Sequence, residues 1–145
     1  MAAPQFFVPP RVTPSRPKRR FSLEQANKTL PLVRRIVADI VQVHKDASAK
    51  QVQLEKLSTN SKQRTLLEQE METAHERFTK LVDELSAIGC ELKDFQIGLV
   101  DFVGRHQGRD VYLCWKLGEE KIQFWHELDA GAAGRQPIDT LQEKE

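Results

Sequence analysis

The feature that most constrains the fold is a hydrophobic repeat that occurs twice along the chain. In each series, apolar residues recur at alternating steps of three and four, the spacing of a helix that packs along another helix. The first series contains one polar member, Lys50, and the second contains none. The first consists of Val33, Ile36, Ile40, Val43, Ala47, Lys50, Leu54 and Leu57, and the second of Leu67, Met71, Ala74, Phe78, Leu81, Leu85 and Ile88.

The segment between the two series has the composition of a turn. Ser58-Thr59-Asn60-Ser61 contains turn-forming residues and no large apolar side chain. Two helices joined by so short a connection pack as antiparallel neighbours. We therefore predict a long antiparallel helical hairpin, coiled-coil-like, that turns near residue 59 or 60.

Local signals mark the ends of this helical region, residues 21–89. Ser22 and Gln25 have the spacing of a capping box, and Gly89 is placed as a helix-terminating glycine. Pro31 disfavours helical geometry at the residue before it. We therefore predict a short first helix that ends near Thr29 and a longer one that begins at Pro31.

After Gly89 the pattern changes to alternation, and β-forming residues dominate. Turns are indicated by Gly104 and Gly108 and again by Gly118, which predicts a meander of short antiparallel strands over residues 90–128. From Ala130 the sequence is typical of loop, and residues 139–145 of a tail. The predicted strands are Cys90–Leu92, Leu99–Val103, Asp110–Trp115 and Ile122–Glu127. A chain of 145 residues is long enough for one ordinary domain, so we predict a single α+β domain over residues 21–138.

Residues 1–20 differ in composition from the rest. They contain five prolines, five basic residues and no acid, which predicts a disordered basic arm. The positive charges between Arg11 and Arg20 could make weak contacts with an anionic partner such as RNA or a lipid surface. The whole chain has a net charge of only +1, which argues against a dedicated nucleic-acid binder.

No apolar run is long enough to cross a bilayer, and no signal-peptide core follows Met1. The two cysteines, Cys90 and Cys114, form no CxxC pair, which suits a reducing compartment. We therefore expect a cytoplasmic protein without a transmembrane segment.

The last predicted hairpin holds the residues that are richest in chemistry. A turn centred on Gly118-Glu119 would place Trp115 opposite Ile122, Leu113 opposite Phe124 and Val111 opposite His126, on a face that packs against the helices. The opposite face would be a binding face for a partner or small ligand, unless the C-terminal segment covers Trp125. That face would carry Tyr112, Cys114, Lys116, Gln123, Trp125 and Glu127.

Catalysis and metal binding depend on the same register. Cys114 and His126 would lie on opposite faces, which argues against a thiol hydrolase, and a slip of one residue would reverse that conclusion. A metal site built from Cys114, His126, Glu127 and Asp101 meets the same objection, although His126 with Asp101 remains feasible if their strands are neighbours. Alternatively, Asp101 and His126 form a buried polar pair, with Arg109 or Arg135 as a further partner.

Several stretches resemble the domain-of-unknown-function 2203 family of bacterial proteins. The resemblance covers residues 21–138 and includes an LCWxxGE…WHE pattern. It implies a small bacterial protein without an established activity, and some members are labelled as related to cell-division initiation. The matching stretches are Phe21–Asn27, Leu30-Pro31, Gly98–Phe102, Gly108–Glu119, Trp125–Leu128 and Gly134-Arg135.

These observations favour a non-enzymatic interaction or scaffold module. The helical hairpin would bind a protein partner or a second copy, and Tyr112, Cys114, Trp125 and Glu127 would form a recognition patch. No catalytic residue and no cofactor is predicted. The alternative is a small-molecule- or metal-binding protein, or an enzyme, that uses the polar residues of the sheet, namely Asp101, Arg109, Glu119, His126 and Arg135.

Overall fold

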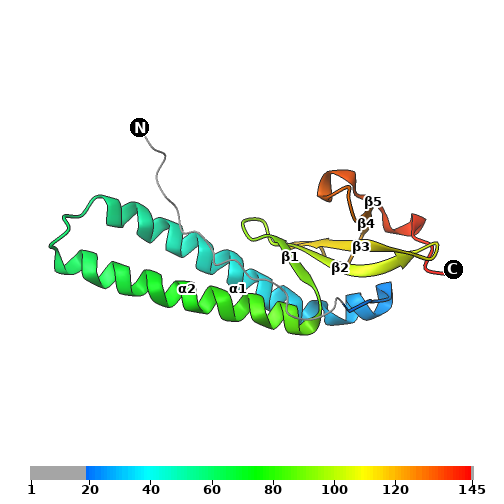
Figure 1. Cartoon of the computed structure of the whole chain (residues 1–145), viewed down its shortest axis with the longest axis horizontal. Coiled ribbons are helices and arrows are strands. Elements are labelled where there is room, and N and C mark those ends of the chain that lie inside the picture. Colours follow the sequence, from blue (N-terminus) through cyan, green and yellow to red (C-terminus); the bar gives the residue numbers. More distant parts are fainter. Residues whose placement is uncertain (1–18, 145) are drawn as a thin grey trace.

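The computed structural model describes residues 19–144 and has two long helices joined to an antiparallel sheet (Figure 1). Helix α1 spans Leu23–Glu55 and helix α2 spans Lys62–Ile88. The helices run side by side in opposite directions, and the chain turns between Lys56 and Ser61, which confirms the predicted hairpin. Coiled-coil supercoiling of the pair stays a prediction.

Helix α1 is continuous through Pro31, so the predicted break near Thr29 is wrong. The capping box itself is confirmed, because Ser22 and Gln25 exchange hydrogen bonds of 3.0 and 3.1 Å. Pro31 removes one backbone donor, but a single buried stripe continues on both sides of it and holds the helix together. That stripe consists of Ala26, Leu30, Val33, Val37 and Ile40.

The sheet has five strands in the order β1-β2-β3-β4-β5, and every neighbouring pair is antiparallel. This order confirms the predicted meander. The fifth strand was not predicted, because its two residues lie in a stretch with the composition of a loop and pair with β4 only through tertiary structure. The strands are β1 Glu91–Asp94, β2 Leu99–His106, β3 Arg109–Lys116, β4 Phe124–Glu127 and β5 Gln136–Pro137, and the single-turn helices η1 and η2 span Ala132–Gly134 and Ile138–Thr140.

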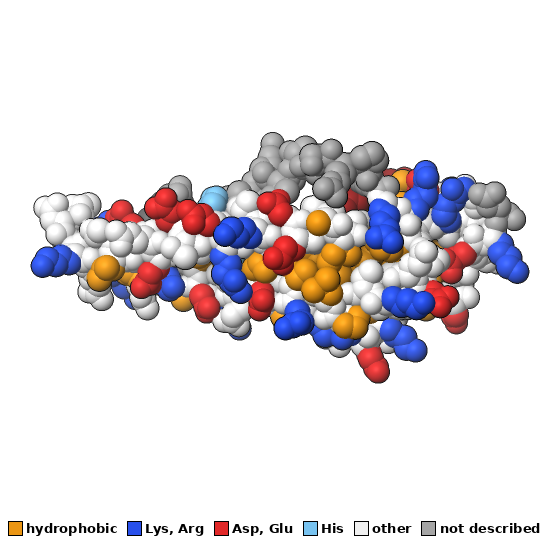
Figure 2. Space-filling view, turned by 90° about the horizontal axis from the view of Figure 1, so that it is seen from below, with side chains coloured by type: hydrophobic (Ala, Val, Ile, Leu, Met, Phe, Trp, Pro, Cys, Tyr) orange, Lys and Arg blue, Asp and Glu red, His pale blue; other side chains and the backbone are white. Residues whose placement is uncertain are grey.

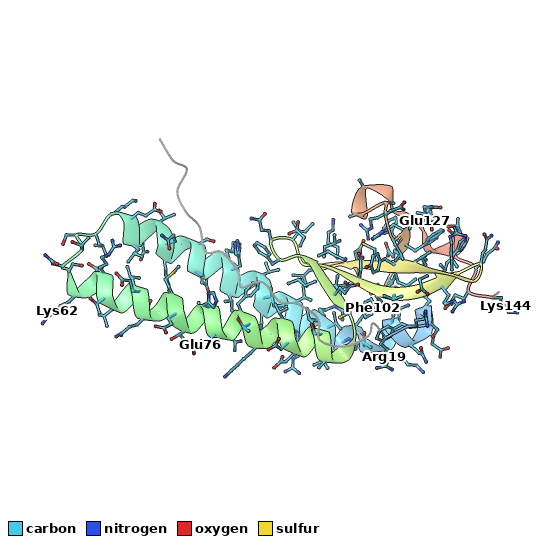
Figure 3. The ribbon with its side chains drawn as sticks, in the orientation of Figure 1. Arg19, Lys62, Glu76, Phe102, Glu127 and Lys144 are labelled. Atoms are coloured by element: carbon cyan, nitrogen blue, oxygen red, sulfur yellow. The ribbon has the colours of Figure 1, made fainter. Side chains whose placement is uncertain are left out.

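The core lies between one face of the sheet and the helix ends nearest to it. Phe102 is on this face and packs edge-on against Phe21, with ring centroids 5.2 Å apart (Figure 3). The opposite end of the hairpin projects beyond the sheet. Residues 44–75, all of which the structure describes, form this end of the hairpin. Only three of their side chains are buried, namely Ala47, Leu54 and Leu67.

The register between β3 and β4 differs by one residue from the prediction. Leu113 lies opposite Trp125 instead of Phe124, and Val111 lies opposite Glu127 instead of His126. The cause is Ile122, which does not join the strand: its side chain is buried in the core, and its backbone N–H donates to Asn27 Oδ1 of α1 over 2.9 Å. The connection is therefore longer than a tight turn, and His126 moves to the face of the sheet that carries Cys114.

The first described residues lie against the sheet. Arg20 forms an isolated parallel bridge with Val103 and an ion pair of 2.9 Å with Asp110. Residues 1–20 are predicted to be disordered, and residues 1–18 of this segment lie outside the part of the chain that the structure describes. Among the described helices, none combines the length and apolar character needed to span a membrane.

Candidate functional site

Three chemically reactive side chains converge on the face of the sheet that points away from the helices. Asp101 of β2 lies opposite Cys114 of β3, and His126 of β4 lies opposite Tyr112, two residues along β3 from Cys114. Each of the three offers one ligand atom, and these atoms all lie within 4.8 Å of one another. Asp101 and His126 are 2% exposed and Cys114 is fully buried. We call these three residues the triad.

The prediction that Cys114 and His126 lie on opposite faces is therefore wrong. The prediction that Asp101 pairs with His126 is confirmed, although β3 separates their strands: the imidazole reaches across β3 to the carboxylate. No described contact joins this pair to Arg109 or Arg135.

The hydrogen bonds of His126 define its orientation. Nδ1 lies 2.8 Å from the Glu127 carbonyl oxygen, which can only accept, so Nδ1 carries a hydrogen and donates it. Nε2 therefore faces Asp101 Oδ2, 3.1 Å away. A favourable contact between these two atoms requires one proton between them, held either by the carboxyl or by the imidazole.

Burial dominates the electrostatics of the other two members. It raises the pKa of the Asp101 carboxyl, and the charges of His126 and Lys93 act in the opposite direction. It also raises the pKa of the Cys114 thiol to about 12, with Asp101 acting in the same direction and Arg135 against it. The thiol is thus protonated at neutral pH, which counts against a thiolate nucleophile.

The second carboxylate oxygen of Asp101 makes no such contact. Oδ1 is buried and has no hydrogen-bond partner among the described residues. A buried carboxylate oxygen without a donor costs free energy, so a cation or donor bound beside it would be stabilising.

Two further side chains border the triad on the side of β1. The Lys93 ammonium lies 4.5 Å from the centre of the Tyr112 ring, and the Tyr112 and His126 rings are 5.4 Å apart. Tyr112 was predicted as a site residue. Lys93 was not, because its place depends on an irregular register between β1 and β2 that the sequence does not signal.

Glu119 and Arg135, both predicted as site residues, form an ion pair beside Cys114. Arg135 Nη2 donates to both carboxylate oxygens of Glu119 at 2.9 Å. The Arg135 side chain is 18% exposed and the Glu119 side chain 15%. The guanidinium lies 4.0 Å from the centre of the Phe124 ring, and Phe124 lies opposite Cys114 in the sheet.

Three predicted site residues lie apart from the triad, which corrects the predicted recognition patch. Trp125 and Glu127 share the face of Leu113 and Val111, not that of Cys114. Glu127 pairs with Arg109 at 2.6 Å, which lowers the pKa of its carboxyl. Trp125 is buried and donates to Thr140 Oγ1 over 2.9 Å, so the alternative that the C-terminal segment covers it is confirmed.

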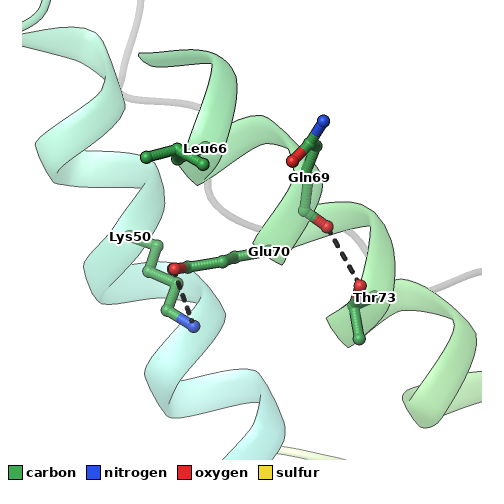
Figure 4. A pocket seen from close by; sticks show the side chains of 5 residues that line it. All are labelled: Lys50, Leu66, Gln69, Glu70 and Thr73. Carbon is green, nitrogen blue, oxygen red and sulfur yellow. Dashed lines mark hydrogen bonds and ion pairs between the residues drawn. The ribbon is translucent and has the colours of Figure 1, made fainter. Parts of the chain in front are cut away.

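The hairpin has a shallow, open hollow of about 270 Å³ (Figure 4). Lys50 and Glu70 in its lining form an ion pair of 3.3 Å, and Thr73 bonds the Gln69 carbonyl. The face of the molecule seen in Figure 2 mixes acidic and basic side chains around hydrophobic ones near its middle. Nothing on it identifies a partner, so the hypothesis that the hairpin binds a protein or a second copy stays a prediction.

Residues 19–138 match the model of a family described as "Uncharacterized conserved protein (DUF2203)". The chain belongs to this family. No curated protein and no solved structure matches the chain. Membership in this DUF2203 family adds no activity to the geometry of the triad.

Proposed function

We propose that this protein binds a divalent transition-metal ion, Zn²⁺ above all, through Asp101, Cys114 and His126. The observation that carries the proposal is the convergence of three different donors from three adjacent strands, one of which, Asp101, has a buried carboxylate oxygen with no partner among the described residues. The interaction module favoured by composition has no comparable support, because no described feature of the hairpin identifies what it would bind.

The donor set favours zinc over the hard cations. Mg²⁺ and Ca²⁺ are bound by oxygen ligands, whereas Zn²⁺ accepts thiolate, imidazole and carboxylate in one site. Each donor is of the kind required. Cys114 supplies a thiol that loses its proton when a metal binds, His126 an imidazole nitrogen that faces the other two residues, and Asp101 a carboxylate. His126 Nδ1 is already held by a carbonyl, the usual support of a metal-ligating imidazole.

Charge also selects a divalent ion. With Cys114 as thiolate and Asp101 as carboxylate, the ligands carry two negative charges that one divalent cation neutralises. Since a net charge is costly in a buried site, this balance favours M²⁺ over a monovalent or trivalent ion. Three protein ligands leave the fourth tetrahedral position open, the arrangement of zinc sites that bind water or substrate.

A purely structural Asp101–His126 pair is the competing explanation. That pair accounts for the 3.1 Å contact between His126 Nε2 and Asp101 Oδ2, and the Cys114 thiol is a further hydrogen-bond partner that lowers the pKa of the Asp101 carboxyl. Asp101 Oδ1 is still left without a close partner, and a metal bound among the three residues would be one.

Metal binding to purified protein tests the proposal directly. Titration of the reduced, metal-free protein with Co²⁺ should give tetrahedral visible bands and a thiolate charge-transfer band that saturate at about one equivalent. Zn²⁺ should displace the Co²⁺. Cys114→Ser should abolish the charge-transfer band.

The chain supplies a matched control in its other cysteine. Cys90 is 3% exposed and its thiol pKa is likewise raised to about 12 by burial, but its Sγ contacts the Leu85 carbonyl at 3.6 Å and lies outside the triad. Cys90→Ser should therefore bind Co²⁺ like the unaltered protein. Binding that does not saturate near one equivalent, or that both cysteine variants lose equally, would overturn the proposal; His126→Gln provides the same test if Cys114→Ser does not fold.

A further inference from the structure

Arg135 lies beside the triad and has a buried donor atom that makes no hydrogen bond among the described residues. Its guanidinium is stacked on Phe124, the cross-strand neighbour of Cys114, at 4.0 Å from the ring centre. Cross-strand neighbours have Cβ atoms about 5 Å apart, so Arg135 lies above the edge of the triad. The segment that holds it begins with η1, where the Arg135 N–H bonds the Ala132 carbonyl.

Glu119 occupies only one nitrogen of this guanidinium. Both hydrogen bonds to Glu119 come from Arg135 Nη2, and Glu119 Oε1 also accepts the backbone N–H of Lys116 over 2.7 Å. Arg135 Nε is buried and has no acceptor within the described part of the chain. A buried N–H without an acceptor costs free energy, and an acceptor bound beside it would recover that cost.

Two of the buried atoms that lack a hydrogen bond are of opposite kind. Asp101 Oδ1 lacks a donor or cation, and Arg135 Nε lacks an acceptor. A metal ion alone satisfies the first. A ligand that binds the metal through an oxygen and accepts a hydrogen bond from Arg135 satisfies the second as well. A guanidinium suits a carboxylate or phosphate better than a neutral ligand, because both partners are charged and the hydrogen bond is stronger.

We propose that the open position of the triad's metal is an oxyanion site, in which a carboxylate or phosphate group binds the ion by one oxygen and accepts a hydrogen bond from Arg135 Nε. This inference rests on the proposed metal-binding function. Glu119 positions Arg135 by accepting two hydrogen bonds from Nη2, and Nε–H is left without an acceptor among the described residues. Asp101, Cys114 and His126 hold the ion, and Arg135 recognises the charge of the bound group.

The test uses the full chain loaded with Co²⁺, whose visible bands respond to a change of the fourth ligand. The protein is titrated separately with acetate and with inorganic phosphate, so that the two sources of oxyanion are distinguished. Arg135→Lys retains the positive charge but lacks the Nε–H donor. Arg109→Lys is the matched control, because Arg109 has its own carboxylate partner, Glu127, on the other face of the sheet.

We expect one of the two anions to shift the Co²⁺ bands saturably and to bind Arg135→Lys at least tenfold more weakly, with Arg109→Lys unchanged. A tenfold loss corresponds to about 1.4 kcal/mol, within the range for a charge-assisted hydrogen bond. Co²⁺ bands that neither anion shifts, or a shift with equal affinity in all three proteins, would overturn the oxyanion site while leaving the metal site intact. A protein that fails to bind Co²⁺ at all would overturn both, and urea unfolding of each variant shows whether it is folded.

Discussion

At the scale of single residues, the burial of Asp101 predicts an unusual pH dependence of stability. Because burial raises the pKa of this carboxyl, the metal-free native state holds its proton to higher pH than the unfolded chain does. Between the ordinary carboxyl pKa and the raised value, the native state thus binds more protons, and stability falls as pH rises. The contribution of Asp101 is fully present below about pH 4 and is lost as pH passes through the raised pKa.

Asp101→Asn should remove this pH dependence, because a carboxamide can donate to His126 Nε2 without titrating. Urea unfolding in the presence of a chelator measures it. The free energy of unfolding of the unaltered protein should fall relative to that of the variant as pH is raised from about 4 towards 8. Parallel curves for the two proteins would show that Asp101 ionises as readily in the native state as in the unfolded chain.

At the scale of secondary structure, Pro31 lowers the stability of helix α1. The residue is exposed, lies within the helix and lacks the N–H that would bond the Asn27 carbonyl. Pro31→Ala should stabilise the protein by about 1–2 kcal/mol, since the restored hydrogen bond and better helix propensity outweigh the entropy returned to the unfolded chain. The converse change at the exposed Ala38 of the same helix, Ala38→Pro, should cost about 3 kcal/mol or more. Thermal unfolding measures both changes, and a destabilised Pro31→Ala variant would contradict this account.

The elements also show which parts of the structure could be predicted from the sequence. The hairpin, its cap at Ser22 and its end at Gly89 depend on neighbours within one or two helical turns, and these were predicted. The β3–β4 register depends on a hydrogen bond between Ile122 and Asn27, which are 95 residues apart. A contact of that kind leaves no trace in local patterning. Because the register decides whether His126 faces Cys114, the triad could not be predicted, although its three residues were all singled out as candidates.

At the scale of the whole molecule, the triad and the hairpin tip differ in how much of the fold supports them. The triad joins β2, β3 and β4 within the sheet. Residues 44–75 bury only three side chains, and His44, at their edge, packs on Phe95. Such a segment opens locally at little cost, while the central strands exchange their amide hydrogens mainly when the whole domain unfolds.

Metal binding should therefore stabilise the sheet and leave the hairpin tip unchanged. At a free Zn²⁺ concentration of one hundred times the Kd, linkage predicts about 2.7 kcal/mol of added stability, or about a hundredfold slower exchange for amides that need global unfolding. Hydrogen exchange followed by mass spectrometry should show this slowing in β2, β3 and β4 but not between residues 44 and 75. The Cys90→Ser variant should respond in the same way and Cys114→Ser should not respond. Slowing that is uniform along the chain, or that appears first at the hairpin tip, would place the ion elsewhere, because a ligand slows only those openings that release it.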